Sequence, residues 1–245
     1  LVENRLTFAY QPVVSARSHR PAFFECLLRI RTPNNLVIPA GQFIPLVEDM
    51  GLIRQIDHFV LDHAVGELRA DPHAVLAINV SAYTTGDAAW LRRLQSHNRS
   101  MPGVMRRLIV EITETAAMRN LETAQHFVET VRSTGARVAL DDFGAGSSSF
   151  RHLKSLQVDI VKIDGLFTGR LGEHPKNLMF FKALLDLAKG CGFETVAECA
   201  ETPQDAMLLA ATGVTYLQGY HFAKPELIRL KGSPVLPLGS APPQE

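Results

Sequence analysis

The chain has 245 residues, 46% of them hydrophobic, and its 25 basic and 25 acidic side chains cancel to a formal net charge of zero. That length suits one α/β barrel, and the balanced charge excludes a general attraction to nucleic acid polymers or anionic membranes. No apolar stretch approaches the ~20 residues of a membrane-spanning helix, and residues 1–10 lack the layout of a signal peptide. Three cysteines are too few for a disulfide framework, which indicates a reducing cytoplasm.

Short apolar segments typical of strands alternate with amphipathic segments along the chain. Two strands, at 8–14 and 22–30, precede a short helix at 43–50 and a longer helix at 52–70, whose apolar residues share one helix face. The later strands are predicted at 74–81, 108–114, 137–143, 159–164, 194–198 and 216–220. The later helices are predicted at 88–97, 121–133, 150–156, 177–192 and 203–213.

This alternation predicts a parallel sheet covered by helices. About eight strands favour a TIM-like (β/α)8 barrel over an open doubly wound sheet, and no GxGxxG follows the first strand. Residues 15–21 are too few for a helical crossover, so we expect one antiparallel strand near the N-terminus. We predict a barrel over 1–229 and a flexible Pro/Gly-rich tail over 230–245. Because the chain begins within its first strand, we expect it to be one domain of a longer regulatory protein.

Polar or acidic residues mark the ends of successive predicted strands. Side chains alternate between the two faces of a strand, so these residues should point into the C-terminal mouth of the barrel, where catalytic groups gather. Their oxygen atoms suit Mg²⁺ or Mn²⁺, and two ions ~3.5–4 Å apart would account for so many ligands. The candidate ligands are Glu25, Asn79, Glu111, Asp141, Asp142 and Glu198.

Each of these residues, taken alone, also has an ordinary structural explanation. A surface carboxylate or a structural ion pair would explain any one of these residues alone, but it would have to be invoked separately for every strand. Lys162 would neutralise part of the negative charge, or hold a bridging water or a phosphate oxygen. Glu114 could simply cap the following segment, and the Gly/Ser loop at 141–149 is weak support for a phosphate site because such loops are often only turns.

Nine short motifs follow one another in a fixed order between residues 8 and 225. They are YQP (10–12), ECLLR (25–29), INVS (78–81), EITE (111–114), DDFGAGSSS (141–149), KID (162–164), AE (197–198), QGY (218–220) and FAKP (222–225). Each motif is short, but their order and spacing together are specific. In the order and spacing of these motifs, the chain resembles the EAL domain, the metal-dependent phosphodiesterase of the bacterial messenger cyclic di-GMP.

The resemblance implies a TIM-like barrel with one reversed strand that hydrolyses cyclic di-GMP to linear pGpG by two-metal activation of water. It implies that Glu25, Asn79, Glu111 and Asp141 ligate one ion. Asp141, Asp142 and Glu198 would serve the second ion. The catalytic residues would be Glu25, Lys162, Glu198 and Glu114, with Lys162 orienting the attacking water and Glu114 holding the loop 141–149, which shapes the second metal site and a dimer contact.

The resemblance also implies a substrate groove, a homodimer and a cytoplasmic location. The groove would be lined by Gln11, Leu27, Arg29, Asp164, Gln218 and Pro225, with Arg29 facing phosphate. Two alternatives stay open: a catalytically weak or silent module that senses cyclic di-GMP, and a different metal-dependent phosphohydrolase on the same barrel.

Two residues depart from the family pattern. Cys26 replaces Ala in the Glu-Ala-Leu motif and should point towards the helix layer, away from the ligands. Cys199 replaces a Gly directly after Glu198. If that position requires a positive φ, a cysteine there strains the loop.

Overall fold

The computed structural model describes residues 5–145, 153–169, 171 and 175–229. In this part of the chain the strands form one sheet in the order β1-β9-β8-β7-β6-β5-β4-β2-β3. Because β1 also pairs with β2, the sheet closes into a barrel, and β3 pairs only with β2 and stays outside it. The strands are β1 (Leu6–Ser15), β2 (Pro21–Arg31), β3 (Val37–Pro39), β4 (Leu76–Asn79), β5 (Leu108–Thr113), β6 (Arg137–Phe143), β7 (Ile160–Ile163), β8 (Glu194–Ala197) and β9 (Tyr216–Leu217).

Strand β1 is the reversed strand of the barrel. It runs antiparallel to both β2 and β9, whereas the pairs from β2 through β4 to β9 are parallel. The short connection between β1 and β2 is a hairpin, as its length requires. The predicted fold, a TIM-like barrel with one antiparallel strand near the N-terminus, is confirmed.

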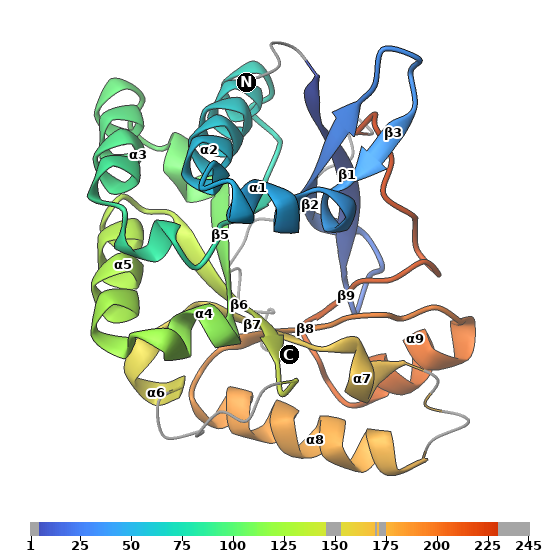
Figure 1. The fold of residues 1–245 in the computed structure, drawn as a ribbon. Helices are drawn as coiled ribbons and strands as arrows, with labels where there is room; N and C mark the ends of the chain where they lie inside the picture. Colours follow the sequence, from blue (N-terminus) through green and yellow to red (C-terminus); the bar gives the residue numbers. More distant parts are fainter. Residues whose placement is uncertain (1–4, 146–152, 170, 172–174, 230–245) are drawn as a thin grey trace.

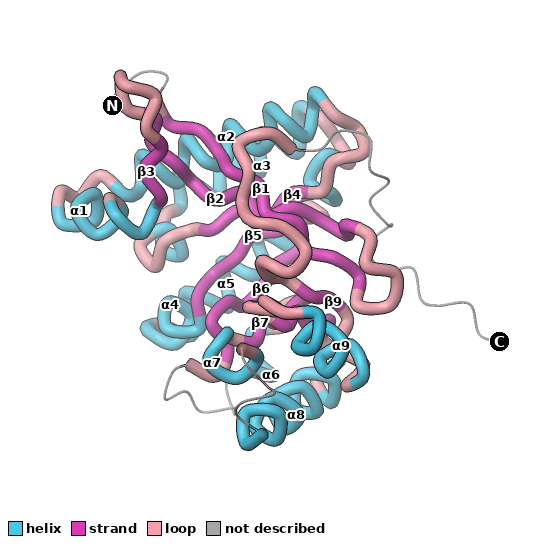
Figure 2. The backbone as a smooth tube through the Cα atoms, turned by 90° about the vertical axis from the view of Figure 1, so that its right-hand side faces the viewer, coloured by secondary structure: helices cyan, strands magenta, loops and turns pink. Residues whose placement is uncertain are grey.

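Helices surround the barrel, with α2, α3 and α5 on one side and α8 and α9 on another (Figures 1 and 2). The α-helices are α1 (Ile44–Asp49), α2 (Ile53–Ala70), α3 (Ala88–Ser100), α4 (Glu114–Arg119), α5 (Leu121–Ser133), α6 (Leu153–Leu156), α7 (Gly165–Thr168), α8 (Pro175–Gly190) and α9 (Pro203–Ala211). Three 3₁₀ turns are η1 (Ala40–Gln42), η2 (Thr84–Gly86) and η3 (Val104–Arg107). The sequence did not predict β3, α4 or α7, and the predicted helix at 150–156 begins outside the described residues.

Two apolar clusters hold the barrel together. The larger cluster lies between the strands and the helices, and it includes the apolar face of α2 that the sequence periodicity predicted. The smaller cluster fills the barrel interior, where the ring of Phe23 meets the ring of Tyr216 edge-on at a centroid distance of 5.6 Å. A packed interior of this kind leaves polar side chains only at the two ends of the barrel.

The N-terminal end of the barrel is closed by polar contacts. Arg137 forms an ion pair with Glu194, and the hydroxyl of Tyr216 donates to the same carboxylate at 3.2 Å. Both charged residues begin their strands and share the inward face with the apolar interior. Access to the interior is therefore from the opposite end.

The seam between β1 and β9 is short. The two strands pair only at Val14–Leu217 and Ser15–Tyr216, and further along β1 the backbone of Tyr10 instead exchanges hydrogen bonds of 2.7 and 3.1 Å with Glu226. An extended segment thus pairs with the edge of β1 there. The predicted tail at 230–245 lies outside the described residues, so the domain boundary stays a prediction. None of the described helices combines the length and the hydropathy that a membrane crossing requires.

Candidate active site

A ring of polar side chains sits directly above the apolar interior of the barrel. In each strand that contributes, an interior apolar residue is followed two positions later by a polar one, because side chains on the same face recur with period two. β1 runs the other way, so its polar Gln11 precedes the interior Val13. The pairs are Phe23 and Glu25, Ala77 and Asn79, Ile109 and Glu111, Ala139 and Asp141, Ile160 and Lys162, Val196 and Glu198, and Tyr216 and Gln218.

Lys162 lies at the centre of this ring. Its Nζ is 3.0 Å from Glu198 Oε1 and 3.4 Å from Glu25 Oε2. It is also 3.1 Å from Glu111 Oε2 and 3.1 Å from Asp141 Oδ1. The side chain of Lys162 is only 1% exposed, and that of Glu111 is fully buried. One cation therefore meets four carboxylates in a site of low dielectric, where charge interactions are strong.

Amide side chains hold Glu25 from the other side. Asn79 Nδ2 donates to Glu25 Oε1 at 2.8 Å, and Gln218 Nε2 donates to Glu25 Oε2 at 2.6 Å. Gln218 also donates to Gln11 Oε1 at 3.3 Å, which links β9 to β1 where their backbones no longer pair. The Glu25 carboxylate is thus fixed by Asn79 of the neighbouring β4 and by Gln218 just after β9, as well as by Lys162.

The pKa values in the ring are strongly shifted. Burial, together with the neighbouring carboxylates, raises the pKa of Glu111 well above its usual value and the pKa of Glu198 to about 8. Burial alone would raise the pKa of Glu25 too, but Lys162, Gln218 and Asn79 together lower it. Burial alone would lower the pKa of Lys162, but the four carboxylates raise it well above its usual value, so Lys162 is charged at neutral pH.

The ring fits divalent cations. One oxygen each from Glu25, Glu111 and Asp141 lies within 4.8 Å of the others, and the same is true of Asp141, Asp142 and Glu198. Asp141 belongs to both groups. Glu111 Oε1 is buried and has no hydrogen-bond partner, which is costly unless another group satisfies it. An all-oxygen donor set of this kind suits Mg²⁺ or Mn²⁺.

The segment after β6 extends the site. Asp142 adopts a positive φ of 56°, and burial with its neighbours Asp141 and Asp164 raises its pKa. Glu114 is buried and accepts a hydrogen bond from the backbone N–H of Gly144 at 3.0 Å. The cap of α4 is Thr113, so the capping role considered for Glu114 is wrong. Residues 146–149 of the Gly/Ser loop lie outside the described residues.

The predicted groove residues are less tightly grouped than the ring. Leu27 and Arg29 follow Glu25 on the same face of β2, both half-buried, and Arg29 Nη1 donates to the carbonyl of Leu28 at 3.0 Å. Asp164 is half-buried and caps α7 by accepting from Leu166 N at 2.7 Å. Pro225 is half-buried in the segment that follows β9.

A cavity of about 260 Å³ opens beside the ring. Glu25, Glu198, Gln11 and Gln218 line it, as the sequence pattern suggests. Cys199, Glu201, Gly219 and Tyr220 complete it, and sequence reasoning did not assign Glu201 or Tyr220 to the site. A signal was present for Glu201, since it is a second carboxylate three residues after Glu198.

The two cysteines that depart from the family pattern lie in different environments. Cys26 is buried in the outer cluster, on the opposite face from Glu25, as its strand parity predicted. Cys199 has a positive φ of 53°, so the position does take the conformation that favours glycine. Its Sγ fills the space beside Gly165 that an added Cβ at that position would need.

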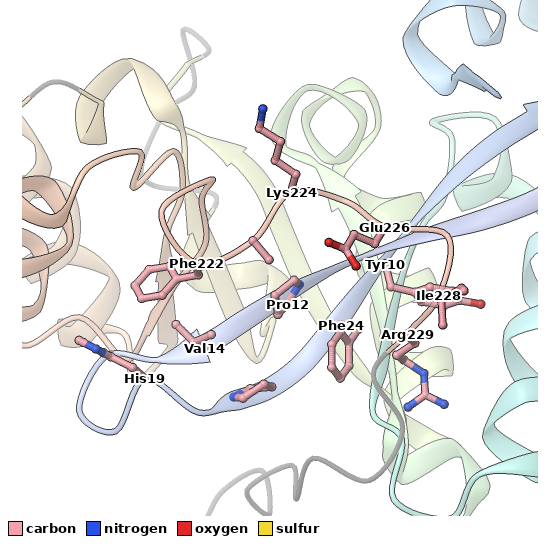
Figure 3. A pocket seen from close by; sticks show the side chains of 12 residues that line it. Tyr10, Pro12, Val14, His19, Phe24, Phe222, Lys224, Glu226, Ile228 and Arg229 are labelled. Carbon is pink, nitrogen blue, oxygen red and sulfur yellow. The ribbon is translucent and has the colours of Figure 1, made fainter. Parts of the chain in front are cut away.

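A second cavity, of about 220 Å³, lies on the outer face of the β1–β2 hairpin (Figure 3). Tyr10, Phe24 and Phe222 give it a mainly apolar lining, and the segment 222–229 forms one wall. None of the ring carboxylates lines this cavity.

Comparison with known proteins agrees with this geometry. Residues 1–225 match the model of the EAL domain family. The chain is 32% identical over 91% of its length to cyclic di-GMP phosphodiesterase PdeB of Shewanella oneidensis, and 33% identical over 92% to cyclic di-GMP phosphodiesterase PA2567 of Pseudomonas aeruginosa. It spans 27% and 39% of the lengths of these two relatives.

Solved structures give the same result. The fold matches the cyclic di-GMP complex of the phosphodiesterase PaMucR with a TM-score of 0.84 and 31% identity, covering 91% of this chain and 92% of that one. It matches the FimX EAL domain of Pseudomonas aeruginosa bound to cyclic di-GMP with a TM-score of 0.85 and 25% identity, covering 92% of each chain. The reversed β1, the polar ring and the family match together show that the chain belongs to the EAL domain family.

Proposed function

We propose that this chain hydrolyses cyclic di-GMP to linear pGpG with the help of two divalent ions, Mg²⁺ or Mn²⁺. The observation that carries the proposal is the convergence of Glu25, Glu111, Asp141 and Glu198 around Lys162 at the open mouth of the barrel. The named activity of the relatives and the cyclic di-GMP complexes of similar structures support the choice of substrate.

The ligand sets follow from the two carboxylate groups. Glu25, Asn79, Glu111 and Asp141 would hold the first ion, and Asp141, Asp142 and Glu198 the second. When bound, such ions lower the pKa of water and offset the charge that develops on the phosphate and on the leaving oxygen.

The chain's own residues would position the reactants. Lys162, whose Nζ lies 3.0 to 3.4 Å from four ring carboxylates, would donate a hydrogen bond that orients the attacking water. Water would attack phosphorus in line, the bond to the 3′ oxygen would break, and the proton that the water loses would balance the one that the 3′ oxygen takes up to leave as a hydroxyl. Arg29 would pair with a phosphate, while Gln11, Leu27, Asp164, Gln218 and Pro225 would line the groove. Glu114 would act through Gly144, whose N–H it binds, by fixing the segment after Asp142.

A silent sensor of cyclic di-GMP is the second candidate function. It would use the same groove without cutting the substrate. The filled ligand positions favour hydrolysis over this alternative, because an inactive site has no need for four carboxylates in one strand-end ring, which repel one another and cost free energy to bury.

Incubation of the purified chain with cyclic di-GMP and Mg²⁺, followed by chromatography, tests the proposal. We expect pGpG to appear and a chelator to abolish it. Glu25→Ala should lower turnover at least about a hundredfold, whereas Glu129→Ala, on the exposed face of α5, should leave it unchanged. Binding without cleavage in Mg²⁺ and in Mn²⁺ would favour the sensor, and full turnover by Glu25→Ala would refute the assigned site.

We also propose a homodimer, a cytoplasmic location and attachment to further regulatory domains. Apolar side chains on α7 and α8 support the dimer: Leu166 is 66% exposed, Met179 61% and Phe180 50%. The short span of the relatives that this chain covers supports the further domains.

A further inference from the structure

A carboxylate sits on the buried face of α2. Asp57 is only 4% exposed and lies among the apolar residues that pack this helix against the barrel. Burial raises its pKa, which shows that the site disfavours the charge. An apolar residue would fill this position at lower cost unless the carboxylate has a specific task.

The side chain of Asp57 accepts hydrogen bonds from the turn after β4. Its Oδ2 accepts hydrogen bonds from Ser81 N at 3.0 Å, from Ser81 Oγ at 2.7 Å and from Thr84 Oγ1 at 2.6 Å. The helix side is fixed as well, since the fully buried Trp90 donates from Nε1 to the Asp57 carbonyl at 3.2 Å. Asp57 therefore ties a rigid helix to one turn of backbone.

A candidate metal ligand, Asn79, lies directly before that turn. Asn79 is the last residue of β4, two positions before Ser81, and its side chain is exposed, so packing does not hold it. Its Nδ2 donates to Glu25 Oε1 at 2.8 Å, which leaves its carbonyl oxygen free to bind a cation. The position of that oxygen depends on the backbone that follows Asn79. Val80 N donates to Glu111 O of β5 at 3.0 Å, and Asp57 holds the next residue, Ser81.

We propose that Asp57 is a positioning residue for the metal site: by clamping Ser81 and Thr84 it fixes the backbone that directs the Asn79 amide oxygen at the cation shared with Glu25. This inference rests on the proposed metal site. Groups that orient a ligand without touching the metal typically change metal affinity by about 10–100-fold when removed.

Titration of the chelator-treated protein with Mn²⁺ in a calorimeter tests the proposal directly. Asp57→Leu should raise the dissociation constant for Mn²⁺ about tenfold or more. Asp57→Asn should lose less affinity than Asp57→Leu, because an amide oxygen with two lone pairs can keep two of the three hydrogen bonds that Oδ2 now accepts. Should Asp57→Leu fail to fold, the double variant Ser81→Ala/Thr84→Val removes two of the three donors and is expected to weaken Mn²⁺ binding several-fold.

A matched control separates positioning from general stability. Asp159 also holds a backbone N–H, that of Val138 at 2.8 Å, but it does so at the N-terminal end of the barrel. Asp159→Leu should lower the melting temperature and leave Mn²⁺ affinity unchanged. Unchanged affinity in folded Asp57→Leu or in the double variant overturns the proposal, as does an equal loss in Asp159→Leu.

The outcomes also distinguish this inference from the proposed function. If the wild type binds Mn²⁺ but releases no pGpG, while Asp57→Leu binds Mn²⁺ more weakly, the inference stands and hydrolysis falls. If the wild type cleaves cyclic di-GMP and the variants bind Mn²⁺ equally, hydrolysis stands and the inference falls. A wild type that binds neither Mn²⁺ nor Mg²⁺ refutes both.

Discussion

The ammonium group of Lys162 is the positive charge around which four carboxylates are packed, at 3.0 to 3.4 Å. Breaking a buried ion pair by removing one partner usually costs about 3–5 kcal/mol, because the remaining charge is left uncompensated. Lys162 thus has a structural task in the metal-free protein in addition to the catalytic one proposed above.

Lys162→Met should therefore lower the free energy of unfolding of the chelator-treated protein by about 3–5 kcal/mol, measured by urea denaturation. Mn²⁺ should restore much of this loss, because a bound cation offsets the same carboxylates. Lys182→Met, on the exposed face of α8, serves as the control and should change stability little. Equal stabilities for the two variants without metal would contradict this account.

Cys199 and Gly165 form a complementary pair. The sulfur occupies the space that a side chain at position 165 would need, so Gly165→Ala should overpack the site and destabilise the fold by about 1–3 kcal/mol. With Cys199→Gly in the background, the same Ala should be nearly neutral. A double-mutant cycle on thermal unfolding measures the coupling, and additive effects would show that the two residues do not compete for space.

At the scale of elements, the strand ends act together as one titrating unit. Burial raises the pKa of Glu111 and, to about 8, that of Glu198, so the folded protein without metal holds protons that the unfolded chain releases above about pH 4.5. A folded state that binds more protons loses stability as pH rises. Stability is lost over the pH range between the pKa of the group in the unfolded chain and its pKa in the folded protein. For Glu198 this range ends at about pH 8.

Chelator-treated protein should consequently be less stable at pH 8 than at pH 6, by at most about 1.4 kcal/mol per pH unit for each proton held. Glu198→Gln should flatten this slope, because an amide does not titrate. Thermal unfolding at the two pH values with and without Mn²⁺ gives the comparison. A metal-free protein that gains stability between pH 6 and pH 8 would refute the assignment of raised pKa values.

Sequence could predict the strands and their polar ends because both follow from a local period of two. The interior residue Ala139 and the ring residue Asp141, for example, are separated by one outward-facing leucine, and that pattern is visible without a structure. The long helix α2 was predictable for the same kind of reason, from its period of 3.6.

Contacts between segments far apart in the chain were not predictable. The bridge from Tyr10 to Glu226 and the clamp from Asp57 to Ser81 join residues whose local sequence carries no sign of the partner. A signal for Asp57 did exist, since a carboxylate on the apolar face of a helix requires a buried partner. The identity of that partner depends on tertiary packing, as does the positive φ of Cys199.

At the scale of the whole molecule, the apolar side chains on α7 and α8 set an expectation for assembly. Phe180 packs against Phe167 at a centroid distance of 6.2 Å, yet it remains half exposed beside Met179. Apolar groups grouped on one surface favour association, because covering them removes apolar area from water. A second copy of the chain would cover them symmetrically.

Phe180→Glu should therefore convert a dimer into a monomer in light scattering without lowering stability by more than about 1 kcal/mol, since surface substitutions seldom cost more. Met207→Glu tests the specificity of the surface: Met207 is 66% exposed on α9, so its replacement should leave the dimer intact. A wild type that stays monomeric at high concentration would rule out the dimer. A dimer that survives Phe180→Glu but not Met207→Glu would move the contact from α8 to α9.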